Sequence, residues 1–426
     1  MFYRSFCYYI ILALIVTIVP VLIYLYVLKR EMCWSSILLA QTSKLLITDL
    51  YPKADLSNID QVRRMFDKML CADERDFSCS SFVPYYNTRN YTRSLVKRQT
   101  IARNRIQRIW DFTIFSEDIS EDCTGEKSCA SYFDPDGIHL RIYEPYRSVK
   151  SAAHPIIIWV HGGGFILGHH HDNSKCIALA NRTSSVVISI EYRLAPEHVF
   201  PYGRHDVLTA VKWIASSGAA MLELESTDPH KVYVFGESAG GHHAASAMLD
   251  IDLPSIKGMV LIYPEIEYGG HHKLPSEKEY ENINGLLRGS QDEWFWTMYL
   301  GTHLNVTERM HLADNNFRIN LLNAPDEYVK NFVAKKLRVL VLLAKYDILY
   351  SEGRAYVDLL EKHGVDVLSF EYNTVHRFFG IDTFDSSLQS MTSILDFLSI
   401  DLNNQTKEPP VYKEQHHNDE DQEFEF

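Results

Sequence analysis

The sequence has little positive charge. Lysine and arginine number 42 against 55 aspartates and glutamates, which gives a formal net charge of −13. Because phosphate backbones bind to basic surfaces, this balance argues against a nucleic acid as the main partner. The chain also lacks internal repeats of solenoid length. Its hydrophobic content of 46% and aromatic content of 12% exclude wholesale disorder and predict one large globular domain.

Cysteine is scarce, with seven in the chain. Four of them form two close pairs, Cys71/Cys79 and Cys123/Cys129. Pairs of this kind suit disulfides in an oxidising compartment. Zinc is the alternative, although the spacings are wider than those usual for zinc ligands.

Charge is absent from a long run near the N-terminus, residues 5–28, "SFCYYIILALIVTIVPVLIYLYVL". The run is long enough to cross a bilayer, and no small-residue cleavage site follows it. We therefore predict a retained signal anchor over residues 1–30, with a transmembrane helix over about 5–28. Basic residues flank both ends, so the positive-inside rule does not decide the orientation.

Four N-x-Ser/Thr sequons bear on that orientation. They begin at Asn90, Asn181, Asn305 and Asn404. Together with the cysteine pairs they favour a luminal domain, which predicts a single-pass membrane protein of the endoplasmic reticulum. At the other end of the chain, residues 406–426 are polar and acidic and are predicted to form a disordered tail.

Short β-branched runs dominate the sequence after residue 137. They cover residues 137–145, 155–160, 185–192, 231–235, 256–263, 337–344 and 365–372. Helical segments lie between most of them, so the pattern predicts a mostly parallel sheet with helices on both faces. Residues 31 to about 110, in contrast, are predicted to be helical. Functional sites in such sheets lie at the carboxyl ends of the strands.

The segment Gly236-Glu237-Ser238-Ala239-Gly240 follows one of these strands. It fits the G-x-S-x-G turn that exposes a nucleophilic serine between a strand and a helix. An ordinary glycine-rich strand-to-helix turn is the alternative. Glu237 is interpreted as a supporting residue.

A glycine run, His161-Gly162-Gly163-Gly164-Phe165, follows another strand. It lacks the Lys-Ser/Thr ending of a phosphate-binding P-loop. We interpret it as an oxyanion hole, in which the amides of Gly163, Gly164 and Ala239 receive the negative oxygen of a tetrahedral intermediate.

Four motifs together carry a family resemblance: "HGGGFILG", "YRLAPEHVFP", "GESAGG" and "KYDILYSEG". Over residues 130–400 the chain resembles the hormone-sensitive-lipase group of α/β-hydrolases, and within it the membrane-anchored arylacetamide deacetylases. The resemblance implies an α/β-hydrolase domain over residues 31–405, with helical cap elements at about 31–130 and 265–335. It also implies a serine triad that cleaves small-molecule or lipid esters, or some amides, without metal or cofactor.

The acid and base of such a triad follow the serine in chain order. Asp347 comes directly after one late strand and His376 after the next, so we assign them as acid and base for the nucleophile Ser238. Glu352 and His363 are the rival acid and base, and we place both on the helix between these strands. A catalytically silent hydrolase fold used for binding or adhesion is the alternative function.

Two replaced family residues, a histidine pair and an aromatic segment also bear on the site. Arg377 and Ser351 replace a glycine and an acidic residue that are usual in the family. The pair His242-His243 could hold a metal, but adjacent helical side chains diverge, which disfavours this interpretation. The aromatic segment 290–302 either lines a pocket for apolar acyl or aryl groups or anchors the cap to the core.

Overall fold

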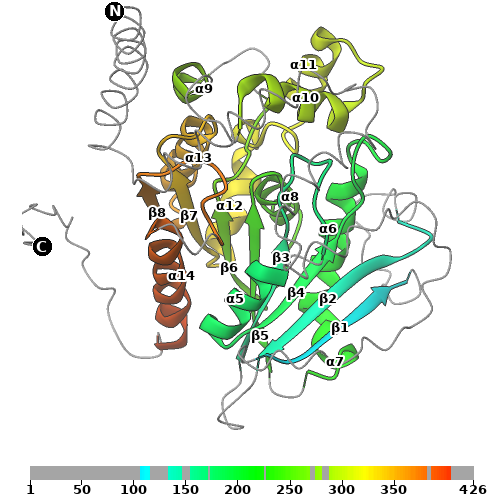
Figure 1. Ribbon diagram of the computed structural model, residues 1–426, viewed down its shortest axis with the longest axis vertical. Helices are drawn as coiled ribbons and strands as arrows, with labels where there is room; N and C mark the ends of the chain where they lie inside the picture. Colours follow the sequence, from blue (N-terminus) through cyan, green and yellow to red (C-terminus); the bar gives the residue numbers. More distant parts are fainter. Residues whose placement is uncertain are drawn as a thin grey trace, which may run out of the picture.

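A computed structural model of the 426-residue chain describes residues 106–115, 133–145, 154–170, 173–224, 227–268, 274–280, 287–380 and 385–403. Its centre is an eight-stranded sheet (Figure 1). The strands are β1 (Ile106–Ile114), β2 (Ile138–Pro145), β3 (His154–Val160), β4 (Val186–Glu191), β5 (Thr227–Glu237), β6 (Ile256–Ile262), β7 (Arg338–Ala344) and β8 (Asp366–Tyr372).

The strand order is β1-β2-β4-β3-β5-β6-β7-β8. From β4 to β8 all neighbours are parallel, whereas β2 is antiparallel to both β1 and β4. The parallel strands are nearly continuous apolar runs because both of their faces are buried. In β3, for example, Ile156 and Ile158 belong to one core cluster, and Ile157 and Trp159 belong to the other.

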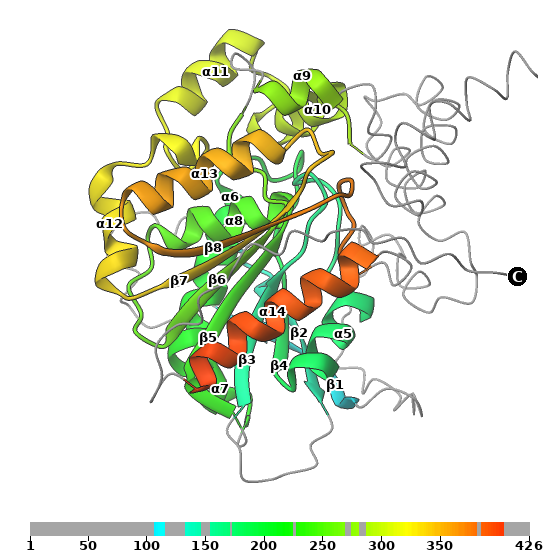
Figure 2. The same ribbon diagram turned by 90° about the vertical axis from the view of Figure 1, so that its left-hand side faces the viewer.

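Helices cover both faces of the sheet (Figure 2). One face carries α5 (Asn173–Thr183) and α14 (Asp385–Asn403). The other carries α6 (Tyr202–Trp213), α8 (Ala239–Met248), α12 (Asp326–Ala334) and α13 (Tyr350–Lys362). Three short helical segments connect these elements: the π-helix η5 (Ile214–Gly218), α7 (Ala219–Met221) and the 3-10 helix η6 (Leu321–Asn323). The predicted mostly parallel sheet with helices on both faces is confirmed.

Three further helices lie beyond the carboxyl ends of the strands, at the top of Figures 1 and 2. They are α9 (Pro275–Tyr280), α10 (Gly289–Leu300) and α11 (Val306–Asp314). Phe295, Trp296, Tyr299 and Met310 of α10 and α11 join Phe165 in a separate buried cluster. These helices form the helical cap over the sheet edge.

One expectation about the cap is wrong. Residues 106–114, which fell within the predicted helical region, form strand β1 at the edge of the sheet. Polar pairs across β1 and β2 explain the difference, because Arg108 and Asp111 lie opposite Glu144 and Arg141 and form ion pairs with them. Such pairs stabilise a sheet without a clean apolar alternation.

The predicted anchor, the acidic tail and both cysteine pairs lie outside the described residues. Among the described helices, none is long and apolar enough to cross a membrane. Cys176 lies in α5 and is buried.

Candidate active site

Ser238 occupies the turn between β5 and α8 with φ 54° and ψ −125°. This conformation is strained for a residue with a side chain, and the close packing of the turn maintains it. A Cβ on Gly236 would come within 2.4 Å of the Gly240 carbonyl oxygen, and one on Gly240 within 2.3 Å of the Val160 carbonyl oxygen. Gly236 therefore allows the turn to close on itself, and Gly240 allows it to pack against the end of β3.

The structure brings Ser238, His376 and Asp347 into one hydrogen-bonded chain. Ser238 Oγ lies 3.0 Å from His376 Nε2, and His376 Nδ1 lies 2.6 Å from Asp347 Oδ2. All three side chains are buried. The arrangement is the one in which an imidazole can accept a serine proton while a carboxylate holds its tautomer.

The loops after β7 and β8 position the acid and the base. The amide of Leu349 donates to Asp347 Oδ1 over 3.1 Å, which orients the carboxylate. The two loops are joined directly, because the amide of Tyr346 donates to the carbonyl of Thr374 over 3.0 Å. The ring of Tyr263 packs against His376 with centroids 4.8 Å apart and limits its movement.

The rival acid and base lie elsewhere. Glu352 is in the first turn of α13, where its Oε1 accepts the Ile266 amide over 3.0 Å. His363 follows the last residue of the same helix, and its Nε2 lies 3.0 Å from Asp326 Oδ1. Both therefore have hydrogen-bond partners other than Ser238 and His376.

The glycine run after β3 lies beside the serine. A Cβ on Gly162 would come within 3.2 Å of Ser238 Cβ, and Gly163 and Gly164 have φ values of 137° and 58°. Tyr192 supports the start of this loop, since its hydroxyl donates to the His161 carbonyl over 2.7 Å. The loop thus brings backbone close to the serine hydroxyl, as an oxyanion hole requires.

Glu237 is buried directly before the nucleophile turn. Lys175 Nζ forms an ion pair with its Oε2 at 2.5 Å, and the Tyr263 hydroxyl donates to its Oε1 over 2.8 Å. Burial is the largest influence and opposes ionisation of Glu237, but Lys175, Arg377 and the Tyr263 hydroxyl together outweigh it, so the pKa of this carboxyl is lowered. Glu237 thus joins α5 to the turn and takes no place in the serine–histidine chain.

Sequence reasoning missed a group of buried carboxyls between the cap and α13. Burial raises the pKa of Glu265 and of Glu352 well above the usual value, and it raises that of Asp292 to about 7. Asp292 and Glu352 also line a small pocket with Ile348 and Leu349, which follow the triad acid. The carboxyls come from separate elements, so no short motif announces them.

The aromatic cap residues pack inward. Trp296 and Tyr299 are fully buried, and Tyr299 stacks on Phe165 with centroids 4.1 Å apart. His242 lies edge-on to Trp296 at 5.3 Å, and burial lowers its pKa to about 3. These contacts anchor the cap to α8 and the glycine-rich loop. The rings of His242 and His243 lie 6.2 Å apart within the same aromatic cluster.

Phe295 is the cap residue placed at the site itself. A Cβ on Gly164 would come within 2.5 Å of its ring. Phe295 thus lies over one of the predicted oxyanion donors.

Ser351 and Arg377, the two residues that depart from the family pattern, are both placed by the structure. Ser351 exchanges hydrogen bonds of 3.0 and 3.1 Å with Ser276, which ties α13 to α9. Arg377, directly after His376, has φ 64°, a region that favours glycine. The glycine that is usual in the family at this position therefore suits the positive φ that Arg377 adopts here.

Comparisons with known proteins agree with this geometry. A family model described as "alpha/beta hydrolase fold" matches residues 157–380. Arylacetamide deacetylase of Bos taurus is 29% identical over 282 residues, covering 54% of this chain and 69% of the relative. An arylesterase of Saccharolobus solfataricus is 29% identical over 245 residues, covering 57% and 72%.

Among solved structures, an esterase of the archaeon Pyrobaculum calidifontis superposes with a TM-score of 0.63 and 26% identity. The alignment covers 86% of this chain and 98% of the esterase. The chain belongs to the α/β-hydrolase family.

Proposed function

We propose that this protein, a carboxylic ester hydrolase, works through a covalent acyl-enzyme formed on Ser238. Ser238 Oγ attacks the ester carbonyl while His376 takes its proton and then delivers it to the leaving alcohol. Asp347 holds the imidazole and stabilises its charged form. Water then attacks the acyl-enzyme by the same steps in reverse and releases the acid.

The observation that carries this proposal is the continuous contact from Ser238 through His376 to Asp347, at 3.0 and 2.6 Å. The amides of Gly163, Gly164 and Ala239 are the proposed donors to the oxyanion. Each such donor contributes about 3 kcal/mol to lowering the barrier. A catalytically silent binding protein would have no need of this chain of contacts beside a glycine-rich loop.

Covalent labelling tests the nucleophile. The full chain should react with a serine-directed organophosphorus probe, and Ser238→Ala should abolish both labelling and ester hydrolysis. Ser290→Ala, at an exposed serine of α10, is the matched control and should label like the parent. Undiminished labelling of Ser238→Ala would place the nucleophile elsewhere, whereas a parent chain that neither labels nor hydrolyses any ester would support the binding function.

We further propose that the substrates carry an apolar acyl or aryl group, including lipid esters and aryl amides of the kind implied by the arylacetamide deacetylase relative. Phe295 over Gly164 supports this. A panel of esters and amides of increasing acyl length tests it. Preference for short, charged acyl groups would contradict the proposal.

We also propose that residues 5–28 anchor the protein in the endoplasmic reticulum membrane with the hydrolase domain in the lumen. Asn305 is exposed and caps α11, accepting the Glu308 amide over 3.0 Å. Thr307→Ala removes this sequon but keeps the cap, so it should remove one glycan without unfolding the domain. A chain with no glycosidase-sensitive mass that is cut by protease from the cytosolic side would reverse the orientation.

A further inference from the structure

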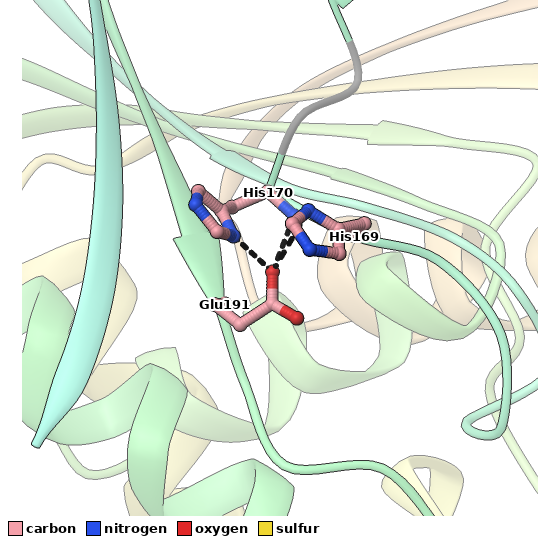
Figure 3. A group of neighbouring side chains, drawn as sticks. All are labelled: His169, His170 and Glu191. Carbon is pink, nitrogen blue, oxygen red and sulfur yellow. Dashed lines mark hydrogen bonds and ion pairs between the residues drawn. The ribbon is translucent and has the colours of Figure 1, made fainter. Parts of the chain in front are cut away.

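Three metal-ligating side chains meet where the glycine-rich loop ends. His169 and His170 close the loop that starts at His161, and Glu191 is the last residue of β4. Their ligand atoms all lie within 4.8 Å of one another. Figure 3 shows both imidazoles turned toward the same carboxylate oxygen.

The distances suit a small divalent ion. His169 Nδ1 lies 3.4 Å from Glu191 Oε2. Ligands about 2.0–2.1 Å from a tetrahedral Zn²⁺ are separated by about 3.3 Å, so this pair is already spaced for coordination. His170 Nδ1 lies closer, in a hydrogen bond to the same oxygen, which also accepts the His170 amide, so the His170 ring must move outward to admit the ion.

The surroundings resemble the outer shell of a metal site. His170 Nε2, the nitrogen away from Glu191, lies 3.8 Å from Asp111 Oδ1, and Arg141 holds Asp111 with two hydrogen bonds. Metal-binding histidines commonly direct their second nitrogen toward a carboxylate in this way.

We propose that His169, His170 and Glu191 form a Zn²⁺ site that ties the end of the glycine-rich loop to β4. Two imidazole nitrogens and one carboxylate oxygen favour zinc or a similar transition ion over Ca²⁺ or Mg²⁺, which prefer all-oxygen ligands. The side chains of His169 and Glu191 are 20% and 15% exposed, so an ion can enter from solvent. Coordination through Nδ1 requires the His170 tautomer whose proton is on Nε2, where it faces Asp111.

This site is distinct from the triad, and it departs from the expectation of a protein without metal. It also differs from the His242-His243 pair, whose rings are buried among aromatic residues. The site would brace the loop that carries Gly163 and Gly164 without taking part in the reaction.

Zinc titration of the full chain after chelator treatment tests the proposal by calorimetry, with circular dichroism to check folding. The parent should bind one Zn²⁺ that Glu191→Gln and His169→Asn weaken at least about tenfold. Asp111→Asn should weaken it less than loss of a ligand. His311→Asn, at an exposed histidine of α11, is the matched control and should bind like the parent.

X-ray absorption at one equivalent of zinc separates this site from the cysteines. The expected first shell contains only nitrogen and oxygen at about 2.0–2.1 Å, with imidazole scattering. A sulfur shell at about 2.3 Å would assign the ion to cysteines and overturn the proposal. Equal affinity in the parent, Glu191→Gln and His169→Asn, or no zinc uptake by the parent, would also overturn it.

Discussion

The ion pair behind the nucleophile turn offers a sharp test of how the fold holds the site. Lys175→Met keeps most of the apolar stem of the side chain but removes its ammonium group. Glu237 would then keep its carboxylate inside the protein with a hydrogen bond from the Tyr263 hydroxyl and the charge of Arg377, but without its closest cation. Its burial, the largest influence on its pKa, would no longer be opposed by Lys175.

The expected cost follows from this burial. Breaking a buried ion pair by removing one partner typically costs about 3–5 kcal/mol. The Lys175 side chain is 18% exposed, whereas that of Glu237 is 4% exposed, so we expect the lower end of the range, about 3 kcal/mol. Lys175→Met/Glu237→Gln should recover most of this loss, because the remaining amide is neutral.

The stabilities of the parent and of Lys175→Met should change with pH in opposite directions. In the parent, the folded pKa of Glu237 lies below its ordinary value of 4.5, so its contribution is present above pH 4.5 and is lost as the pH falls through the folded value. In Lys175→Met, we expect burial to outweigh the remaining influence of Arg377 and Tyr263 and to raise that pKa, so stability should instead fall as the pH rises above 4.5. The difference between the two proteins should therefore be small near pH 4 and largest at neutral pH.

Urea denaturation at a series of pH values measures both quantities. Glu237→Gln alone completes the double-mutant cycle and gives the coupling energy. A cost below about 1 kcal/mol at neutral pH, or a cost independent of pH, would show that water reaches Glu237 and that the pair is no more than a surface contact.

Three other predictions concern the site. Asp347→Asn should lower kcat about 10⁴-fold in steady-state assays while Glu352→Gln costs far less, and the reverse order would refute the acid assignment. The pKa of Asp292 is raised to about 7 from an ordinary 3.8, so the folded protein loses stability as the pH rises from about 4 to 7. Asp292→Asn should therefore raise the melting temperature more at pH 8 than at pH 4. An equal shift at both pH values would contradict this. Gly164→Ala would force a Cβ against the Phe295 ring and should lower kcat about 10²–10³-fold, and unchanged kinetics would remove Gly164 from the proposed oxyanion hole.

The central sheet could be predicted because its strands are buried on both faces. Continuous apolar runs such as 155–160 and 256–263 end within a residue or two of the observed strands β3 and β6. The placement of Ser238, Asp347 and His376 at one sheet edge followed from the same pattern, since parallel strands end together. Their common location follows from the fold, whereas the hydrogen bonds between them depend on the side-chain geometry.

Features that depend on pairing between distant segments could not be predicted in this way. Strand β1 is partly exposed and depends on ion pairs with β2, so its own sequence has no clear period. The buried Asp292 and Glu265 come from α10 and from the loop after β6, and their shared environment exists only once the cap closes over the sheet. The meeting of His170 with Glu191 likewise requires the loop after β3 to return to the end of β4.

Backbone strain in the described residues gathers around the proposed site. Four of the seven non-glycine residues with positive φ are Phe165, Ser238, Tyr263 and Arg377, which lie in the glycine-rich loop, at the nucleophile, after β6 and beside His376. Each such residue costs about 1–3 kcal/mol unless its surroundings compensate. At Ser238 they do so directly, because its amide donates to the Ile262 carbonyl and its own carbonyl accepts from Glu265. The preference of non-glycine residues for negative φ is thus violated where the chain must bring reactive groups together. The packed strands on either side supply the stability that offsets this strain.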